Sequence, residues 1–246
     1  MAEGQAVGGD RAYAEVVSGL RFPEPPVSDG VVALRPWRDE DARVKAAWSQ
    51  DAHIVRWTGI PANYTEAAAL ARTAQTEKAR KAGHSLALAI TDAGSGAVLG
   101  SCDIRRPDRE DPALGEVGYL LSETARGRGV ATRAMGLLIA WSFRELGIER
   151  VQALVHPDNL GSAGVLHRLG FQREGLLRRY RPGDAGREDR VLYSVLPEEL
   201  SCSGSAAGTL SPALSWRRRG GGPPAGAQPD EVAQAATTAA SSPSGS

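Results

Sequence analysis

The segment that most constrains the fold is residues 116–141, where an apolar run, a loop of glycine and arginine, and an amphipathic stretch follow one another. Val117 to Leu121 are typical of a buried strand, and from Val130 to Trp141 the apolar residues recur at helical spacing. The first backbone N–H groups of such a helix have no carbonyl partners, and the helix dipole is positive there. A strand, a glycine loop and a helix in this order therefore predict an anion-binding site.

The composition of the loop indicates which anion the site favours. Gly127 and Gly129 let the backbone approach phosphate oxygens without interference from a Cβ atom. Arg126, Arg128 and Arg133 add positive charge and forked hydrogen-bond donors. Diphosphate fits this combination, so the segment predicts a phosphorylated cofactor.

Charge and cysteine content limit the function classes. Lys plus Arg and Asp plus Glu balance at 29 each in 246 residues, so no global basic field indicates nucleic-acid binding. Cys102 and Cys202 form no disulfide framework and show no metal-ligand spacing, which favours a reduced, cytoplasmic setting. The longest uncharged apolar stretch, residues 134–143, is shorter than the ~20 residues that span a bilayer, and no signal peptide is recognisable. We therefore expect no membrane association.

Composition also predicts the domain organisation. Residues 1–28 are small, polar and punctuated by proline, and we expect a weakly ordered arm. Residues 29–198 form the predicted domain, and residues 199–246, rich in Ser, Ala, Gly and Pro, have too little apolar surface to offset the entropy of ordering. Arg217 to Arg219 beside Trp216 could contact nucleic acid or acidic lipid, but we expect a solvated charge cluster.

Between these ends, helical and extended patterns alternate, which predicts an α/β fold of the mixed α+β type with several antiparallel pairs. The aromatic residues between His53 and Tyr64 lie in a loop or short helix and could line a cleft. We expect strands at residues 30–37, 85–90, 97–104, 117–121, 151–155, 170–180 and 190–196, and helices after Asp39, from Thr65 to Lys81, from Val130 to about Leu146, and from the HPDN turn to Leu169.

Two familiar phosphate loops do not fit residues 126–132. The G-x-x-x-x-G-K-[ST] spacing of nucleoside triphosphatases does not occur. A dinucleotide fingerprint would require glycine where Thr132 stands, and the acidic residue at the expected distance, Glu149, precedes a strand instead of ending one.

A third pattern, R-x-x-G-x-A at residues 126–131, resembles the acetyl-CoA loop of the GNAT superfamily of N-acetyltransferases. The motifs LRPWRDEDA, GEVGYLL and HPDNLGSAGVLHRLGFQREG resemble the RimJ/RimL-like branch, and the resemblance covers roughly residues 29–197. It implies the GNAT acyl-CoA N-acyltransferase fold, a central, mostly antiparallel sheet of about seven strands flanked by about four helices. It also implies acetyl-CoA as co-substrate and no metal.

The resemblance assigns roles to individual positions. The backbone of the fourth strand should pair with the pantetheine arm of acetyl-CoA, and the following loop should wrap the pyrophosphate with N–H groups. The family fold also splays its fourth and fifth strands apart to admit the cofactor. The implied cofactor-binding residues are Tyr119, Leu120, Leu121, Arg126, Gly127, Arg128, Gly129, Val130, Ala131, Asn159 and Ser162.

Two residues are candidates for catalysis. Glu116, at the start of the fourth strand, could act as general base directly or through water, or it could be a solvated edge carboxylate or an arginine's structural partner. Ser162 could hydrogen-bond or protonate the CoA sulfur, or it could cap a helix. In many superfamily members a tyrosine of this helix acts as the acid that protonates the leaving thiolate. This chain has Leu166 at the equivalent position, so we do not expect the tyrosine mechanism. The four histidines, His53, His84, His156 and His167, show no ligand spacing.

The acceptor is less constrained. A protein α-amino group has a pKa of ~8 against ~10.4 for lysine, so a weak base suffices to deprotonate it. This favours acetylation of a protein N-terminus, in agreement with the RimJ/RimL resemblance. We expect the enzyme to be a monomer or a homodimer. A small-molecule amine or antibiotic remains an alternative acceptor. A module that binds acetyl-CoA without turnover is the second alternative.

Overall fold

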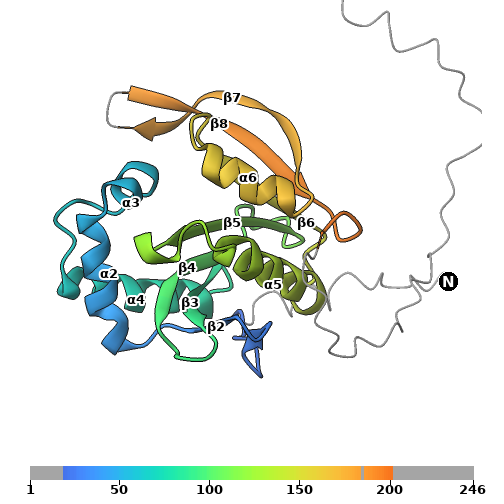
Figure 1. Cartoon of the computed structure of the whole chain (residues 1–246). Helices are drawn as coiled ribbons and strands as arrows, with labels where there is room; N and C mark the ends of the chain where they lie inside the picture. The colour runs from blue at the N-terminus through green and yellow to red at the C-terminus, as the bar shows by residue number, and fades with distance from the viewer. Residues whose placement is uncertain (1–18, 184–185, 202–246) are drawn as a thin grey trace, which may run out of the picture. The chain divides into compact units, whose positions relative to one another are not determined.

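A mixed β-sheet organises the computed structural model, which describes residues 19–183 and 186–201 (Figure 1). Its eight strands lie in the order β1-β2-β3-β4-β5-β6-β8-β7. All neighbouring strands are antiparallel except β5 and β6, which are parallel. This arrangement confirms the predicted fold class. The strands are β1 (Val27–Ser28), β2 (Val32–Pro36), β3 (Ser85–Asp92), β4 (Val98–Arg105), β5 (Leu114–Leu121), β6 (Arg150–Val155), β7 (Gln172–Gly183) and β8 (Gly186–Val195).

Several helices begin where the sequence supplies a cap or a glycine turn. Thr65 accepts a hydrogen bond from the Ala68 N–H at the start of α4, and Asp51 accepts from two N–H groups of α3. Short 3₁₀ segments precede or follow several helices. The helices are α2 (Ala42–Ala47), α3 (Ala52–Trp57), α4 (Glu66–Lys81), α5 (Val130–Glu145) and α6 (Leu160–Arg168), with η1 (Asp39–Asp41), η2 (Trp48–Gln50) and η3 (Glu123–Ala125).

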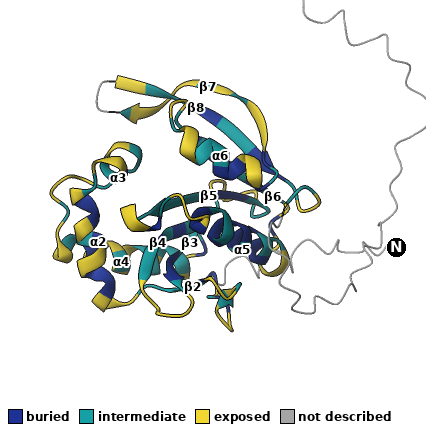
Figure 2. Ribbon diagram, in the orientation of Figure 1, coloured by how far each residue is buried: buried dark blue, intermediate teal, exposed yellow. Residues whose placement is uncertain are grey.

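The two faces of the central strands have different environments. Alternate residues such as Leu88 and Cys102 are fully buried in one core with Leu138 of α5. Figure 2 shows the buried segments of α5 and of the central strands in dark blue. The intervening residues, including Ser101 and Asp103 of β4, line a cleft on the other face. One face of the sheet therefore supplies stability, and the other carries polar groups into a cleft.

The N-terminal segment differs from the expected weakly ordered arm over residues 19–28. These residues contribute β1, which pairs with β2, and Leu20 is 4% exposed in the core. The Leu20 carbonyl also accepts a hydrogen bond from the Arg80 guanidinium of α4. Single apolar anchors of this kind escape a compositional argument, because composition averages over the segment. The Arg217–Arg219 cluster and Cys202 lie outside the described residues.

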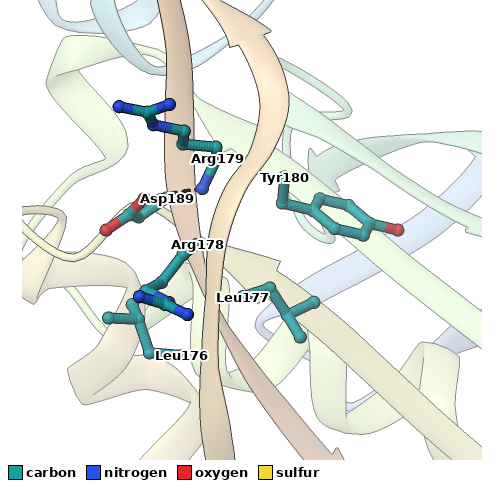
Figure 3. A pocket seen from close by; sticks show the side chains of 6 residues that line it. All are labelled: Leu176, Leu177, Arg178, Arg179, Tyr180 and Asp189. Atoms are coloured by element: carbon teal, nitrogen blue, oxygen red, sulfur yellow. Dashed lines mark hydrogen bonds between the residues drawn. The ribbon is translucent and has the colours of Figure 1, made fainter. Parts of the chain in front are cut away.

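The last hairpin is longer than its sequence pattern predicts. Its pairing continues past the predicted ends, through Arg181 with Glu188 to Gly183 with Gly186. Register shifts between Leu177 and Arg181, where Arg179 has a φ of 50° and donates its N–H to Asp189 Oδ1 at 2.7 Å (Figure 3). A side chain of β8 thus stabilises the irregular backbone of β7. The alternation of apolar and polar residues along β7 does not predict this irregularity.

None of the helices in the described ranges has both the length and the apolar character that crossing a bilayer requires.

Gly100 provides a test of the contact between β4 and β5. A Cβ atom at this position would lie 2.2 Å from the Leu120 carbonyl oxygen, which belongs to rigid backbone. We expect Gly100→Ala to lower the free energy of unfolding by about 1–3 kcal/mol, because the strands must separate. Urea unfolding measures the change. Gly94→Ala is the matched control, since its Cβ would meet only the Asp92 carboxylate at 3.5 Å, and an equal loss in both variants would contradict the expectation.

Candidate active site

The parallel strands β5 and β6 separate part way along their length. They pair only at Leu114 with Arg150, Gly115 with Val151 and Glu116 with Gln152. Beyond that point β5 continues to Leu121 and β6 to Val155 without further pairing between the two strands. This confirms the expected splay of the strands. The unpaired edge of β5 is available to another extended chain.

A cleft of about 1490 Å³ occupies this region. It is lined by residues of helices α2 to α6, of strands β3 to β8 and of the loops between them. A volume above the ~300–1,000 Å³ of ordinary small-molecule pockets can admit a large cofactor together with a second substrate.

The loop before α5 leaves the start of that helix uncapped. Gly129 is the N-cap residue, at a φ of 75°, and no side chain accepts a hydrogen bond from the helix N–H groups. By contrast, side chains cap α3, α4 and α6. Gly127 is also left-handed, with a φ of 71°, and a Cβ atom at either glycine would meet no atom within 4 Å. The first N–H groups of α5 are therefore open to an anion.

Arg126 ties this loop to α3. Its guanidinium donates to the Leu121 carbonyl at 3.1 Å and 3.3 Å and forms an ion pair with Asp51, the residue that caps α3. Burial alone would raise the pKa of Asp51, but hydrogen bonds from Arg126 and from the α3 backbone outweigh it and hold that pKa below its ordinary value. An anion at the loop would compete with Asp51 for Arg126.

The other two arginines of the loop region also contact protein groups. Arg128 donates to the Thr124 carbonyl at 3.3 Å, and Arg133 pairs with Asp29 at 2.7 Å. Arg128 is exposed, so it can turn toward a ligand at small cost.

Ser162 lies in the cleft on the first turn of α6, where Asn159 is the helix cap. The Asn159 side chain accepts the Ser162 N–H at 3.1 Å, so capping falls to Asn159 and the Ser162 hydroxyl has a different partner. That partner is Tyr119, whose hydroxyl donates to Ser162 Oγ at 3.1 Å. Burial raises the pKa of Tyr119 to about 12, so its hydroxyl remains a donor at neutral pH. Leu166 is fully buried one turn later.

The contact between Tyr119 and Ser162 does not follow from the family resemblance, which gives a role only to the backbone of this strand. The available signal was a tyrosine within an otherwise aliphatic strand, since a buried tyrosine hydroxyl usually has a hydrogen-bond partner.

Glu116 lies where β5 and β6 separate and is 8% exposed. Its carboxylate receives a hydrogen bond from Gln152 at 3.2 Å and lies 3.4 Å from Arg105 Nη2. It is therefore an arginine's partner inside the cleft, and the solvated-edge interpretation is wrong.

Asp103 is another cleft carboxylate, and sequence reasoning missed it. It lies on β4 opposite Gly118, and its Oδ2 is 3.0 Å from Arg105 Nε. Burial raises the pKa of Asp103 and nearby Glu116 adds to the rise, while Arg105 and Arg72 oppose it. Its position depends on strand register, which no local motif encodes.

Aromatic side chains form another wall of the cleft. Trp57 and Tyr64 line it, as the sequence predicted for residues 53–64, and His156 packs against Trp57 with ring centroids 5.2 Å apart. Trp37 and Trp48 contact each other edge to face at 5.8 Å.

Among residues 19–183 and 186–201, no group of His, Cys, Asp and Glu side chains is arranged to hold a metal ion.

Lys45 is buried beneath this aromatic wall. Its ammonium lies 3.7 Å from the Trp37 ring centroid and donates to Thr73 Oγ1 at 2.7 Å. Burial lowers the pKa of Lys45 from 10.5 to about 8, because the charged form loses solvation.

This shift predicts a pH dependence of stability. Between pH about 8 and 10.5, Lys45 is protonated in the unfolded chain and mostly neutral in the folded one. At Lys45 the unfolded state then binds more protons, so this residue should add on the order of 2 kcal/mol to the free energy of unfolding across this window. Burial raises the pKa of the Cys102 thiol and acts in the opposite direction, because the unfolded thiol loses its proton first. Urea unfolding of wild type and Lys45→Met at several pH values therefore measures the effect. The difference between the two proteins should grow by this amount as the pH rises, and a constant difference would contradict the assignment.

Comparison with known proteins gives a consistent picture. Residues 32–172 match the family model described as an acetyltransferase (GNAT) domain. The chain is 36% identical over 104 residues to an uncharacterized N-acetyltransferase, p20, of Bacillus licheniformis, covering 42% of this chain and 58% of that protein. It is 32% identical over 79 residues to the [ribosomal protein uS5]-alanine N-acetyltransferase of Escherichia coli (strain K12), covering 32% of this chain and 41% of that enzyme. The chain thus spans about half the length of the curated relatives it matches.

A solved structure is similar over a longer range. Mycobacterium smegmatis RimJ in complex with CoA-disulfide has a TM-score of 0.63 and 29% sequence identity. The similarity covers 73% of this chain and 89% of that one.

Proposed function

The chain belongs to the GNAT acetyltransferase family, and from this premise we propose that it moves the acetyl group of acetyl-CoA to a primary amine. The observation that carries the proposal is the uncapped start of α5 beside the unpaired edge of β5. The free N–H groups at the start of α5 can bind a pyrophosphate, and the unpaired edge of β5 can form hydrogen bonds with the amide groups of the pantetheine arm. The CoA-disulfide bound to the related M. smegmatis RimJ supports a cofactor of the same chemistry here.

The residues present fit this cofactor. The glycines of the loop leave open space above the helix start, and a backbone phosphate site requires such space. A pyrophosphate would take the place of Asp51 at Arg126. We assign cofactor binding to Tyr119, Leu120, Leu121, Arg126, Gly127, Arg128, Gly129, Val130, Ala131, Asn159 and Ser162.

Acetyl-CoA supplies a thioester whose carbonyl carbon can accept a neutral amine. Glu116 lies at the fork of the two strands and takes the proton that the amine must lose, directly or through one water. A backbone N–H on β5 polarises the thioester carbonyl. A bond would form between nitrogen and the acetyl carbon while the bond from that carbon to sulfur breaks. Ser162 would donate a proton to the departing sulfur and regain one from water. Tyr119 positions the Ser162 hydroxyl by donating to it.

We propose that the acceptor is the N-terminal α-amino group of a protein, of the ribosomal-protein type. An α-amino group has a pKa of ~8, so about a tenth is neutral at pH 7 and a carboxylate suffices as base. The name of the E. coli relative agrees with this class of acceptor.

A polycationic antibiotic is the less favoured acceptor, because it requires an acidic cleft. Here Asp103 and Glu116 share the cleft with Lys45, Arg72 and Arg105, so the wall carries mixed charge.

Incubation with acetyl-CoA and a mixed panel of N-terminal peptides and aminoglycosides tests the proposed function. We expect mass spectrometry to place the acetyl group on peptide α-amino groups. Acetylation of aminoglycosides alone would replace the proposed acceptor, and the absence of any acetylated product would contradict the proposed activity.

A further inference from the structure

We infer that Asp103 binds the protonated amine of the acceptor before Glu116 removes its proton. The inference rests on the proposed acetyl transfer and names the group that recognises the acceptor. It also limits the substrate class to amines that arrive as ammonium ions.

Strand register places Asp103 next to the proposed reacting region. Asp103 of β4 pairs with Gly118 of β5, and Arg105 pairs with Glu116. Residues two apart on a strand share a face, so Asp103 and Arg105 lie on one face of the sheet, as do Glu116 and Gly118. All four line the cleft.

Gly118 makes room for the Asp103 carboxylate. A Cβ atom at residue 118 would lie 3.0 Å from Asp103 Oδ1 and 3.1 Å from Arg105 Nη2. The carboxylate and the guanidinium therefore lie over the bare backbone of β5, two residues beyond Glu116.

The carboxylates of Glu116 and Asp103 differ in their exposure and in the number of side chains that contact them. The Glu116 side chain is 10% exposed, with Arg105 near one oxygen and Gln152 on the other. The Asp103 side chain is 30% exposed, and its ion-pair partner among the described residues is Arg105, which contacts Oδ2. Oδ1 of Asp103 is thus the carboxylate oxygen better placed to receive a new donor.

Charge balance identifies what that donor is. Within ion-pair distance, two carboxylates share the single guanidinium of Arg105. Arg72 of α4 also acts on Asp103, at longer range, and does not pair with it in the described part of the chain. An incoming ammonium supplies a second positive charge to this pair of carboxylates, together with directional N–H donors. An ammonium held by Asp103 would then lie on the same face of the sheet as Glu116, whose carboxylate shares Arg105 with Asp103.

The test compares Asp103→Asn with wild type, using the peptide of the panel that wild type acetylates fastest. We expect the KM for the peptide to rise about 10–100-fold, since a hydrogen bond to a charged group is lost, while the KM for acetyl-CoA stays the same. Asp108→Asn, an exposed loop aspartate outside the cleft, is the matched control and should behave like wild type.

Binding measured without turnover isolates the ammonium contact. In the presence of CoA, wild type should bind the free-amine peptide about 10-fold or more tightly than its desamino analogue, and Asp103→Asn should lose this preference. Gly118→Ala, which displaces the carboxylate without removing its charge, should weaken the same preference and decides the matter if Asp103→Asn does not fold.

The outcomes separate the two proposals. Retention of both the peptide KM and the preference for the free amine in Asp103→Asn and Gly118→Ala would overturn the role of Asp103 and leave the acetyl transfer standing. No acetylation of any amine by wild type would overturn the proposed function, and the role of Asp103 with it.

Discussion

Changing Arg126 to Glu and Gly129 to Asp together should abolish the thermal stabilisation of the protein by CoA. A ligand at 100 times its Kd stabilises a protein by about 2.7 kcal/mol, which is easily seen as a shift in Tm. The double variant places two carboxylates where the uncapped helix and the guanidinium should meet the pyrophosphate. We expect Kd for CoA to rise at least about 100-fold, because two charge-assisted contacts become repulsive.

Structure supplies controls for this experiment. A Cβ atom at residue 129 meets nothing within 4 Å, so Arg126→Gln with Gly129→Asn adds similar volume without negative charge. That control should keep part of the CoA-dependent shift. Asp51→Asn keeps a capping residue for α3 but frees Arg126 from its ion pair, so it should bind CoA at least as tightly as wild type. A CoA-dependent shift in Tm as large as that of wild type in the variant with both acidic substitutions would contradict the cofactor assignment.

Removing the proposed acid–base groups should lower kcat. General acid–base catalysis contributes about 10²–10⁴-fold, so Glu116→Gln should reduce kcat by at least about 100-fold. Ser162→Ala should reduce it less, by about 10-fold or more, because water can also protonate a departing thiolate. Steady-state kinetics on the acetylated peptide measures both effects, with Glu110→Gln in the exposed loop as the control.

These kinetics also separate an enzyme from a sensor. A module that only binds acetyl-CoA would show CoA stabilisation and no turnover in the wild-type protein. If wild type turns over and neither variant changes kcat, the roles of Glu116 and Ser162 are wrong, although the fold and cofactor site remain.

Much of the fold could be predicted because its signals are local. Thr65 caps α4 through its own side chain, and the turn-forming segment TDAGSG between two apolar runs marks the pairing of β3 with β4. The extension of β7 and β8 could not be predicted, because Asp189 holds the irregular backbone at Arg179 from the opposite strand.

The site was predictable where a motif covers it and not where distant residues meet. The glycine loop and Ser162 follow from short patterns. The ion pair of Arg126 with Asp51 joins residues 75 positions apart, and the Asp103–Gly118 pairing depends on the register of two strands. Tyr119 reaches Ser162 across 43 positions, so the choice between capping and cofactor contact required the structure.

A crystal structure with acetyl-CoA bound tests the central claim most directly. We expect electron density for the pyrophosphate at the N–H groups of residues 127–131 and for the pantetheine arm along the unpaired edge of β5. The thioester should then lie near Glu116 and Ser162. Density for the cofactor outside the fork between β5 and β6, or an unoccupied fork at saturating acetyl-CoA, would contradict it.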